Sequence, residues 1–290
     1  MILIDGRKVA AEIRASLVEK IKNHKQKPAI VFILVGEDPG SQAYVRMKKK
    51  AALEIGVISH VLELPHETEE EALLEKIRAY NEDETIDGIL VQQPLPKHID
   101  SEKIVNAVLP EKDVDGFHPT NLGKLLIGQE DGFISCTPLG VLRLLEYYKI
   151  PIAGQHVVIV GRSNIVGKPL AALLVQKKPH LNATVTICHS RTKDLKSICL
   201  QGDILIAAIG RAGFIKKDMV KKGATVIDVG ISRIASPNEP PQIVGDVDFE
   251  GVKEVASAMT PVPRGVGPMT IAMLMENTIS SFLRRQKTYD

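Results

Sequence analysis

The sequence predicts an α/β protein of two α/β domains, the second of which is a Rossmann-like, doubly wound parallel sheet. Its 290 residues suggest roughly two domains. Apolar strands alternate with helical segments along the first half, which favours a mainly parallel sheet. In the second half, residues 156–175 have the pattern of a buried strand, a glycine turn and a helix, a combination typical of nucleotide-binding sheets.

Composition excludes several classes of protein. A content of 44% hydrophobic and 25% charged residues is ordinary for a soluble globular protein, and a net charge of +2 is too small to indicate nucleic-acid binding. The three cysteines have neither metal-ligand spacing nor an even count, which favours a reducing compartment. The sequence also has no signal-peptide pattern and no apolar run of membrane length. We therefore expect a cytoplasmic protein that binds no membrane.

In the first half, the expected elements follow the spacing of the apolar residues. They are a helix at 5–27, a buried strand at 29–36, a helix at 42–55 with Ser41 as its N-cap, a strand at 57–64, a helix from a Thr68–Glu71 capping box to Tyr80, and a strand at 89–92.

Candidate site residues follow the carboxyl ends of these strands, where ligands collect in parallel sheets. Tyr44 and Lys48 are four residues apart on one helix and share a face. Only one of the three lysines at 48–50 can point the same way as Tyr44, although a solvated basic face would explain the spacing equally well. Gln92 ends an apolar strand, where its amide could hold a lysine or a substrate, or simply mark where the sheet meets water.

Two acids lie in the loop at 110–119. Asp113 and Asp115 would point in opposite directions in an extended segment, so one would face a cleft while the other ties down the loop. We expect no metal site, because no further carboxylate or histidine cluster stands at ligand spacing. His118 is expected to pack in the loop rather than to catalyse.

The turn after the strand at 157–160 favours an anion, because it aims backbone N–H groups and a positive helix end at one point. Gly161 begins it, but Ser163 and Val166 stand where a dinucleotide fingerprint has glycine. Pro169 excludes a P-loop. The turn is therefore a variant nucleotide turn, with an ordinary strand–helix connection as the alternative.

The next strand, 183–188, ends in the basic stretch His189, Ser190, Arg191. An acid at this position would hold the ribose hydroxyls of NAD, whereas a base suits a 2′-phosphate. Arg162 adds a second guanidinium, so we expect NADP. The remaining expected elements are a helix at 139–148, strands at 203–208 and 224–229, a surface excursion at 236–242, a proline- and glycine-rich loop at 260–270, and a last helix from Pro268 to about Arg285.

Taken together, these stretches resemble the bifunctional methylenetetrahydrofolate dehydrogenase/methenyltetrahydrofolate cyclohydrolase family. The resemblance runs through nearly the whole chain. It is carried by YVRMK (44–48), GILVQQPLP (88–96), PEKDVDGF (110–117), CTPLG (136–140), VVIVGRSNIVGKP (157–169), VIDVGIS (226–232) and TPVPRGVGPMTIAML (260–274).

The resemblance implies a folate-binding catalytic domain, 1–137, completed by a C-terminal helix, 268–290. An NADP domain, 138–267, lies between them, with a cleft where the two domains face each other. It further implies a homodimer, NADP-dependent oxidation of 5,10-methylenetetrahydrofolate, and hydrolysis of the methenyl product to 10-formyltetrahydrofolate.

The resemblance also implies roles for particular residues. Lys48 would be the catalytic lysine, with Tyr44 beside it and Gln92 bonded to it, and Asp115 would recognise the pterin. Residues implied to contact the cofactor are Gly161, Arg162, Ser163, Ser190 and Ile231; those implied to line the substrate are Pro263, Arg264, Gly265, Val266, Gly267, Pro268, Met269, Thr270 and Ile271.

The sequence departs from the family at two positions, since Arg264 stands where glycine is common and Gln93 where leucine is common. Two other functions remain as alternatives. One is a different two-domain NADP-dependent oxidoreductase of the shikimate dehydrogenase type. The other is a non-catalytic nucleotide-binding regulator.

Overall fold

A computed structural model describes residues 1–236 and 239–289. Contacts within the chain divide it into two compact units, described here separately. The six-stranded unit comprises Met1–Ala10 and Thr137–Thr270, and the three-stranded unit comprises Ala11–Cys136 and Ile271–Asp290. The ranges expected from the sequence grouped residues 1–10 with the three-stranded unit. In the structure β1 (Ile2–Leu3) pairs with β11 (Ala258–Met259), a strand of the six-stranded sheet.

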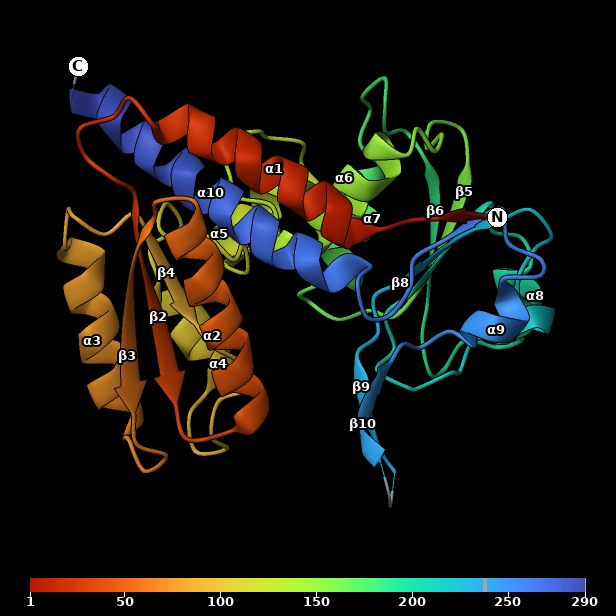
Figure 1. Cartoon of the computed structure of the whole chain (residues 1–290), viewed down its shortest axis with the longest axis horizontal. Coiled ribbons are helices and arrows are strands. Elements are labelled where there is room, and N and C mark those ends of the chain that lie inside the picture. Colours follow the sequence, from red (N-terminus) through yellow and green to blue (C-terminus); the bar gives the residue numbers. More distant parts are fainter. Residues whose placement is uncertain (237–238, 290) are drawn as a thin grey trace. The chain divides into compact units, whose positions relative to one another are not determined.

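The three-stranded unit contains a parallel sheet of order β3-β2-β4 (Figure 1). Its strands are β2 (Ala29–Val35), β3 (Ile58–Leu64) and β4 (Gly88–Val91). The central strand β2 is buried along its whole length, as its unbroken apolar sequence predicts. Leu73 and Ile77 of α3 (Glu70–Glu82) and Ile104 of α4 (Ser101–Ala107) pack with β2 and β4 in one hydrophobic cluster. The other helices are α1 (Gly6–Ile21), which begins in the six-stranded unit, α2 (Pro39–Glu54) and α5 (Pro119–Leu126).

Three of the expected helix starts are wrong for local reasons, and the helix expected from residue 139 begins earlier, at Cys136. The N-cap of α2 is Asp38, whose carboxylate accepts from the backbone N–H of Ser41 at 2.7 Å, with Pro39 in the first turn. The capping box expected for α3 does not form, since its N-cap is Glu69 and makes no side-chain cap. Helix α10 (Val266–Tyr289) begins two residues before Pro268. Proline is tolerated there because N–H groups in a first helical turn have no intrahelical partner.

The six-stranded sheet has the order β1-β11-β8-β7-β5-β6, and all its strand pairs are parallel. Its remaining strands are β5 (His156–Val160), β6 (Thr184–Cys188), β7 (Ile204–Ala207) and β8 (Thr225–Asp228). The helices from Cys136 up to α10 are α6 (Cys136–Tyr147), α7 (Gly167–Leu174), α8 (Leu195–Cys199) and α9 (Phe249–Val252), with a 3₁₀ turn at Lys217–Met219.

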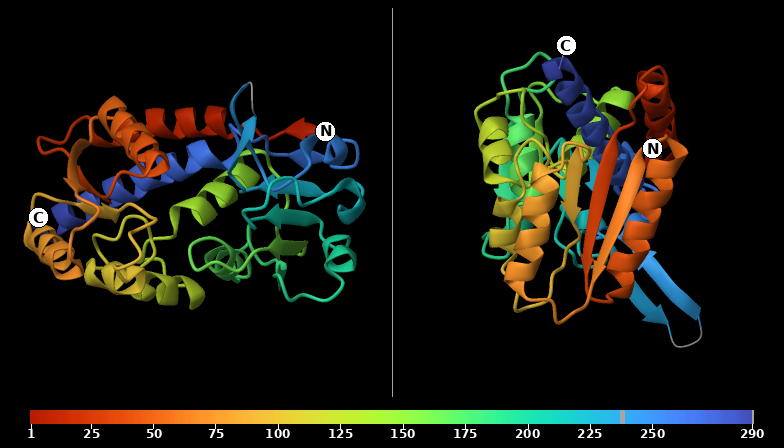
Figure 2. Two further views of the ribbon diagram at one scale, coloured as in Figure 1. Left: turned by 90° about the horizontal axis from the view of Figure 1, so that it is seen from below. Right: turned by 90° about the vertical axis from the view of Figure 1, so that its left-hand side faces the viewer.

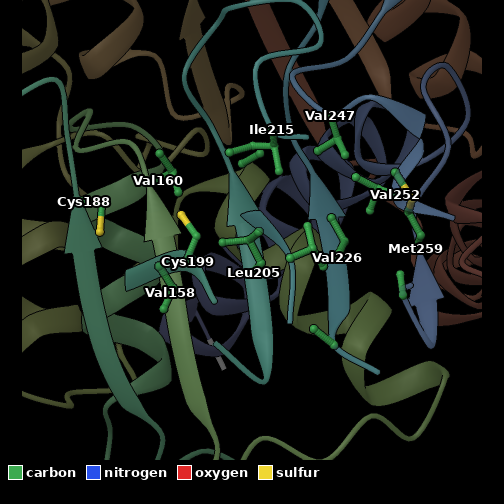
Figure 3. Close-up of a cluster of buried hydrophobic side chains, with 14 residues drawn as sticks. Val158, Val160, Cys188, Cys199, Leu205, Ile215, Val226, Val247, Val252 and Met259 are labelled. Carbon is green, nitrogen blue, oxygen red and sulfur yellow. The ribbon is translucent and has the colours of Figure 1, made fainter. Parts of the chain in front are cut away.

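Helices lie on both faces of this sheet, as the expected doubly wound fold requires. Val158, Leu205 and Val226 of three adjacent strands form a buried cluster with Cys199 of α8 and Val252 of α9 (Figure 3). Helix α7 packs against β5 and β6 but contributes no residue to that cluster. Its own apolar side chains are buried against the opposite face.

The surface excursion expected at 236–242 overlaps a two-stranded antiparallel pair, β9 (Ser232–Ser236) and β10 (Glu239–Val244) (Figure 2). Positions 237–238 of that excursion lie outside the described residues. Across the part of the chain that is described, no helix is both long and apolar enough to cross a membrane.

Candidate active site and nucleotide turn

Lys48 is the buried member of the lysine triplet. Its side chain is on the inner face of α2 with 4% of its surface exposed, whereas Lys49 and Lys50 are exposed. Its Nζ donates to Oε1 of Gln92 at 3.0 Å and lies 5.0 Å from the centre of the Tyr44 ring. The lysine that shares a helix face with Tyr44 is therefore the buried one.

Gln92 follows β4 directly, and a hydrogen bond from its amide nitrogen fixes the orientation of the amide. The Gln92 Nε2 donates to the backbone carbonyl of Gln93 at 2.6 Å, which leaves Oε1 to face Lys48. The same carbonyl accepts from Ser41 Oγ at 3.4 Å. The Gln93 side chain itself accepts from Ser101 Oγ at 3.3 Å.

Burial controls the charge of this cluster. It lowers the pKa of the Lys48 ammonium group, although the negative charge of Asp115 opposes that shift. Burial likewise raises the pKa of Asp115, against the positive charge of Lys48. Both shifts favour the neutral form, so Lys48 can lose its proton more readily than an ordinary lysine. A neutral amine within hydrogen-bond reach of a substrate is a competent general base.

Asp113 ties down the loop that carries Asp115, as the alternation of the two acids predicted. Asp113 is 6% exposed, and its carboxylate accepts from the backbone N–H of Phe117 at 3.2 Å, from that of His118 at 2.8 Å and from Asn121 Nδ2 at 2.9 Å. Burial raises its pKa to about 6. His118 caps α5, with its Nδ1 accepting from the backbone N–H of Thr120 at 3.1 Å.

Two further residues at this site were missed by the sequence reasoning. Buried Asn277 of α10 donates through Nδ2 to the carbonyls of Val114 at 2.9 Å and Ile134 at 3.1 Å. The same amide lies 3.7 Å from Sγ of Cys136, whose thiol donates to the Val114 carbonyl at 3.3 Å. For Asn277, the available signal was an amide among the apolar residues of the last helix.

The nucleotide turn follows β5 and depends on two glycines. Gly161 has φ +139°, and a Cβ built there would lie 2.2 Å from the carbonyl oxygen of Ala208. A Cβ on Gly167 would lie 2.2 Å from the carbonyl oxygen of Gly161. The glycine that lets helix and turn approach is therefore at 167, one position later than the fingerprint requires. Ser163 Oγ accepts from the backbone N–H groups of Val166 and Gly167 at 3.1 and 3.4 Å.

The strand order places this turn at a ligand-binding position of the sheet. The chain passes from β5 to β6 on one side and then returns to β7 on the other. Ligands of open α/β sheets bind outside the carboxyl ends of the strands at such a reversal. Side chains at these ends are exposed: Arg162 and Ser163 after β5, Ser190 after β6, and Ile231 after β8. A glycine turn without room for a Cβ, next to an exposed guanidinium, fits a phosphate-bearing cofactor.

The segment expected to line the substrate divides into two parts. Pro263 and Arg264 are exposed in the loop before α10, and Arg264 has φ +90°. Gly265 is buried, since a Cβ there would lie 2.5 Å from the Pro261 carbonyl oxygen. The other expected residues form the first turns of α10. Val266, Met269 and Ile271 are buried, whereas Gly267, Pro268 and Thr270 are partly exposed.

Over residues 1–236 and 239–289, no three histidine, cysteine, aspartate or glutamate side chains are grouped so that they could hold a metal ion.

The fold and these sites define an α/β enzyme with a nucleotide-binding sheet in one unit and a buried lysine site in the other. The chain belongs to the tetrahydrofolate dehydrogenase/cyclohydrolase family. Residues 4–115 match the catalytic domain of that family, and residues 135–286 match its NAD(P)-binding domain.

Individual relatives are similar to this chain over nearly its whole length. The bifunctional protein FolD of Chloroherpeton thalassium is 55% identical in an alignment of 289 positions that covers 97% of this chain and 98% of the relative. The crystal structure of the FolD enzyme from Campylobacter jejuni has a TM-score of 0.93 at 47% identity, covering 98% of this chain and 99% of that one. The Trypanosoma brucei FolD, complexed with NADP and an inhibitor, has a TM-score of 0.92 at 38% identity, with 98% of each chain covered.

A more distant likeness concerns the fold alone. Shikimate 5-dehydrogenase from Thermus thermophilus has a TM-score of 0.51 at 14% identity, covering 87% of this chain and 99% of that one. The shikimate dehydrogenase alternative is therefore not supported beyond the shared architecture.

Proposed function

We propose that the protein oxidises 5,10-methylenetetrahydrofolate with NADP⁺ and then hydrolyses the methenyl product to 10-formyltetrahydrofolate. The observation that carries the proposal is the buried Lys48 amine, bonded to Gln92 at 3.0 Å in a chain that belongs to the dehydrogenase/cyclohydrolase family. A regulator that only bound nucleotide would have no use for a desolvated lysine of lowered pKa.

In this proposal the first step needs little from the protein beyond placement. Bound NADP⁺ supplies the hydride acceptor. Gly161, Arg162 and Ser163 would hold its phosphates, with Ser190 and Ile231 as further contacts. The exposed guanidinium of Arg162 can grip a 2′-phosphate by paired hydrogen bonds, which favours NADP over NAD.

The second step needs proton transfer, which we assign to Lys48. Its neutral amine takes a proton from the attacking water as the new C–O bond to the methenyl carbon forms. It returns that proton to the ring nitrogen as the C–N bond breaks, and the hydroxyl proton of the adduct leaves to solvent. Gln92 holds the amine and Tyr44 lies under it. Asp115 would accept hydrogen bonds from the amino and ring N–H groups of the pterin.

Lys48→Met tests this assignment. The purified variant, given methylenetetrahydrofolate and NADP⁺, should still produce methenyl absorbance but should lose cyclohydrolase activity by about 10²–10⁴-fold. The matched control is Lys49→Met, the adjacent exposed lysine, which should leave both activities near those of the wild type. Normal cyclohydrolase turnover in Lys48→Met would overturn the role of Lys48. Absence of any NADPH formation by the wild type would overturn the proposed function itself.

We also propose a cytoplasmic homodimer that contacts its second copy through the six-stranded unit. All three cysteines are buried and unpaired, which suits a reducing compartment. Strand β6 is an edge of the sheet, and its Ile187 is 38% exposed. Sedimentation at micromolar concentration tests the dimer, and a single monomeric species would contradict it.

A further inference from the structure

Two buried aspartates at the carboxyl end of the six-stranded sheet have no part in the chemistry above. Asp246 has no exposed surface and Asp228 has 3%. Neither forms an ion pair with a lysine or arginine of the described residues. Their carboxylates are satisfied instead by backbone N–H groups from segments far apart in the sequence.

Asp246 binds three successive N–H groups just beyond β7. Its Oδ2 accepts from Ile209 at 2.6 Å and Gly210 at 2.9 Å, and its Oδ1 accepts from Arg211 at 2.8 Å. Converging N–H groups of this kind form a site for an anion, and here the chain's own carboxylate fills it. The carboxylate therefore fixes the path of residues 209–211.

Asp228 connects that arrangement to the end of β8. Its Oδ1 accepts from the backbone N–H groups of Gly230 and Asp246, both at 2.9 Å, and its Oδ2 accepts from that of Val247 at 2.9 Å. Space is exhausted around the pair, because a Cβ on Gly230 would lie 2.2 Å from Asp246 Cγ and one on Gly245 would lie 1.9 Å from Asp228 Oδ2. The two acids and the two glycines therefore form one closely packed cluster.

This cluster borders the nucleotide turn through the end of β7 and continues into the turn after β8. Residue 208, directly before the segment held by Asp246, is the residue whose carbonyl leaves no room for a Cβ on Gly161. The segment held by Asp228 leads through Gly230 into Ile231, one of the expected cofactor contacts. The turn after β7 lies at a strand end next to the reversal in strand order, and the turn after β8 lies one strand further along the same edge.

We propose that Asp246, with Asp228, is a positioning residue of the NADP site: its carboxylate holds the turn after β7 against Gly161 and, through Asp228, sets the turn that carries Ile231. The inference rests on the proposed function only in naming NADP as the ligand. It assigns no contact between either acid and the cofactor.

Asp246→Asn is the direct test, because an amide keeps the size of the side chain but places an NH₂ group against at least one of three N–H donors. NADP⁺ affinity is measured by titration calorimetry without turnover, and cyclohydrolase activity is measured on methenyltetrahydrofolate. We expect the Kd for NADP⁺ to rise roughly tenfold or more, while the cyclohydrolase rate stays within about twofold of the wild type. If Asp246 had only a structural role, the variant would lose NADP⁺ affinity and cyclohydrolase activity together.

The matched control is Asp248→Asn, two residues away, where a partly exposed acid caps α9 and asparagine caps equally well. It should bind NADP⁺ like the wild type. If Asp246→Asn does not fold, Asp228→Asn replaces it, since that variant disturbs the same cluster and leaves the Asp246 carboxylate in place. Unchanged NADP⁺ affinity in the folded variant, or an equal loss of both functions, would overturn the inference. Failure of the wild type to turn over folate while still binding NADP⁺ would instead count against the proposed function.

Discussion

The side-chain amide of Asn277 donates to the backbone carbonyl of Val114, a residue 163 positions earlier in the chain, at 2.9 Å. Val114 immediately precedes Asp115, so an amide on the last helix helps to hold the loop that carries the acid facing Lys48. The same amide satisfies the carbonyl of Ile134 at 3.1 Å. A single side chain of α10 therefore joins two loops of the three-stranded unit.

Replacing Asn277 by alanine should lower the free energy of unfolding by about 1–3 kcal/mol, because the Ile134 carbonyl loses its amide donor and the Val114 carbonyl keeps only the weak thiol donor of Cys136. Urea unfolding measures the change. Gln286→Ala on the same helix removes an exposed hydrogen bond to Gln26 and should cost far less. Equal losses from the two variants would contradict the clamping role of Asn277.

Asp113 should produce a pH dependence of stability. Its pKa of about 6 exceeds the ordinary value of 3.8, so the folded chain takes up the proton at higher pH than the unfolded chain does. The wild type should therefore gain on the order of 1 kcal/mol relative to Asp113→Asn as the pH falls from 7 to 5. Urea midpoints at the two pH values measure it.

Asp218→Asn is the control for that experiment, since a hydrogen bond from Lys196 lowers the pKa of this exposed acid and no gain is expected between pH 7 and 5. A constant stability difference between the wild type and Asp113→Asn would show that the buried carboxylate does not titrate in this range.

Arg162 should set the choice of cofactor. Arg162→Ala should raise the KM for NADP⁺ by roughly tenfold or more while leaving the KM for NAD⁺ little changed, because a charge-assisted hydrogen bond contributes about 1.5–3 kcal/mol. Comparing kcat/KM for the two cofactors in each variant measures this. Lys253→Ala, another exposed cation of the same unit, should leave the ratio alone. Equal kcat/KM for NADP⁺ and NAD⁺ in the wild type would contradict the role of Arg162 in cofactor choice.

Arg264 adopts a conformation that suits glycine. Its φ of +90° is strained for any residue with a Cβ. Arg264→Gly should therefore stabilise the protein by on the order of 1 kcal/mol, whereas Arg264→Ala, which keeps the Cβ, should not. Thermal unfolding separates the two. Both variants also lack the guanidinium. Comparing their KM for the folate substrate with that of the wild type tests whether Arg264 attracts the carboxylates of the glutamate tail.

Much of the fold could be predicted from the sequence because its signals are local. The unbroken apolar run of β2, the glycine after β5 and the four-residue spacing of Tyr44 and Lys48 each act within one element. Helix starts were less predictable, because several nearby residues compete to cap the same N–H groups. Asp38 rather than Ser41 caps α2 for that reason.

Long-range pairs could not be predicted in this way. The bonds of Asp246 to residues 209–211 and of Asn277 to Val114 join segments that only the folded chain brings together. Strand β1 has two residues, too few to show any period, and is defined only by its pairing with β11. The glycine at 167 was overlooked because the motif was read at fixed spacing, whereas the structure requires close approach rather than a particular count.

The division of the chain between the two units constrains the order in which the protein can mature on the ribosome. Residues 11–136 emerge early, yet their unit also contains residues from Ile271 onward, which are made only after all of 137–270. Asn277 and the rest of α10 reach the Asp115 loop last. The contacts by which α10 holds the Asp115 loop therefore form only after the nucleotide-binding sheet has been synthesised.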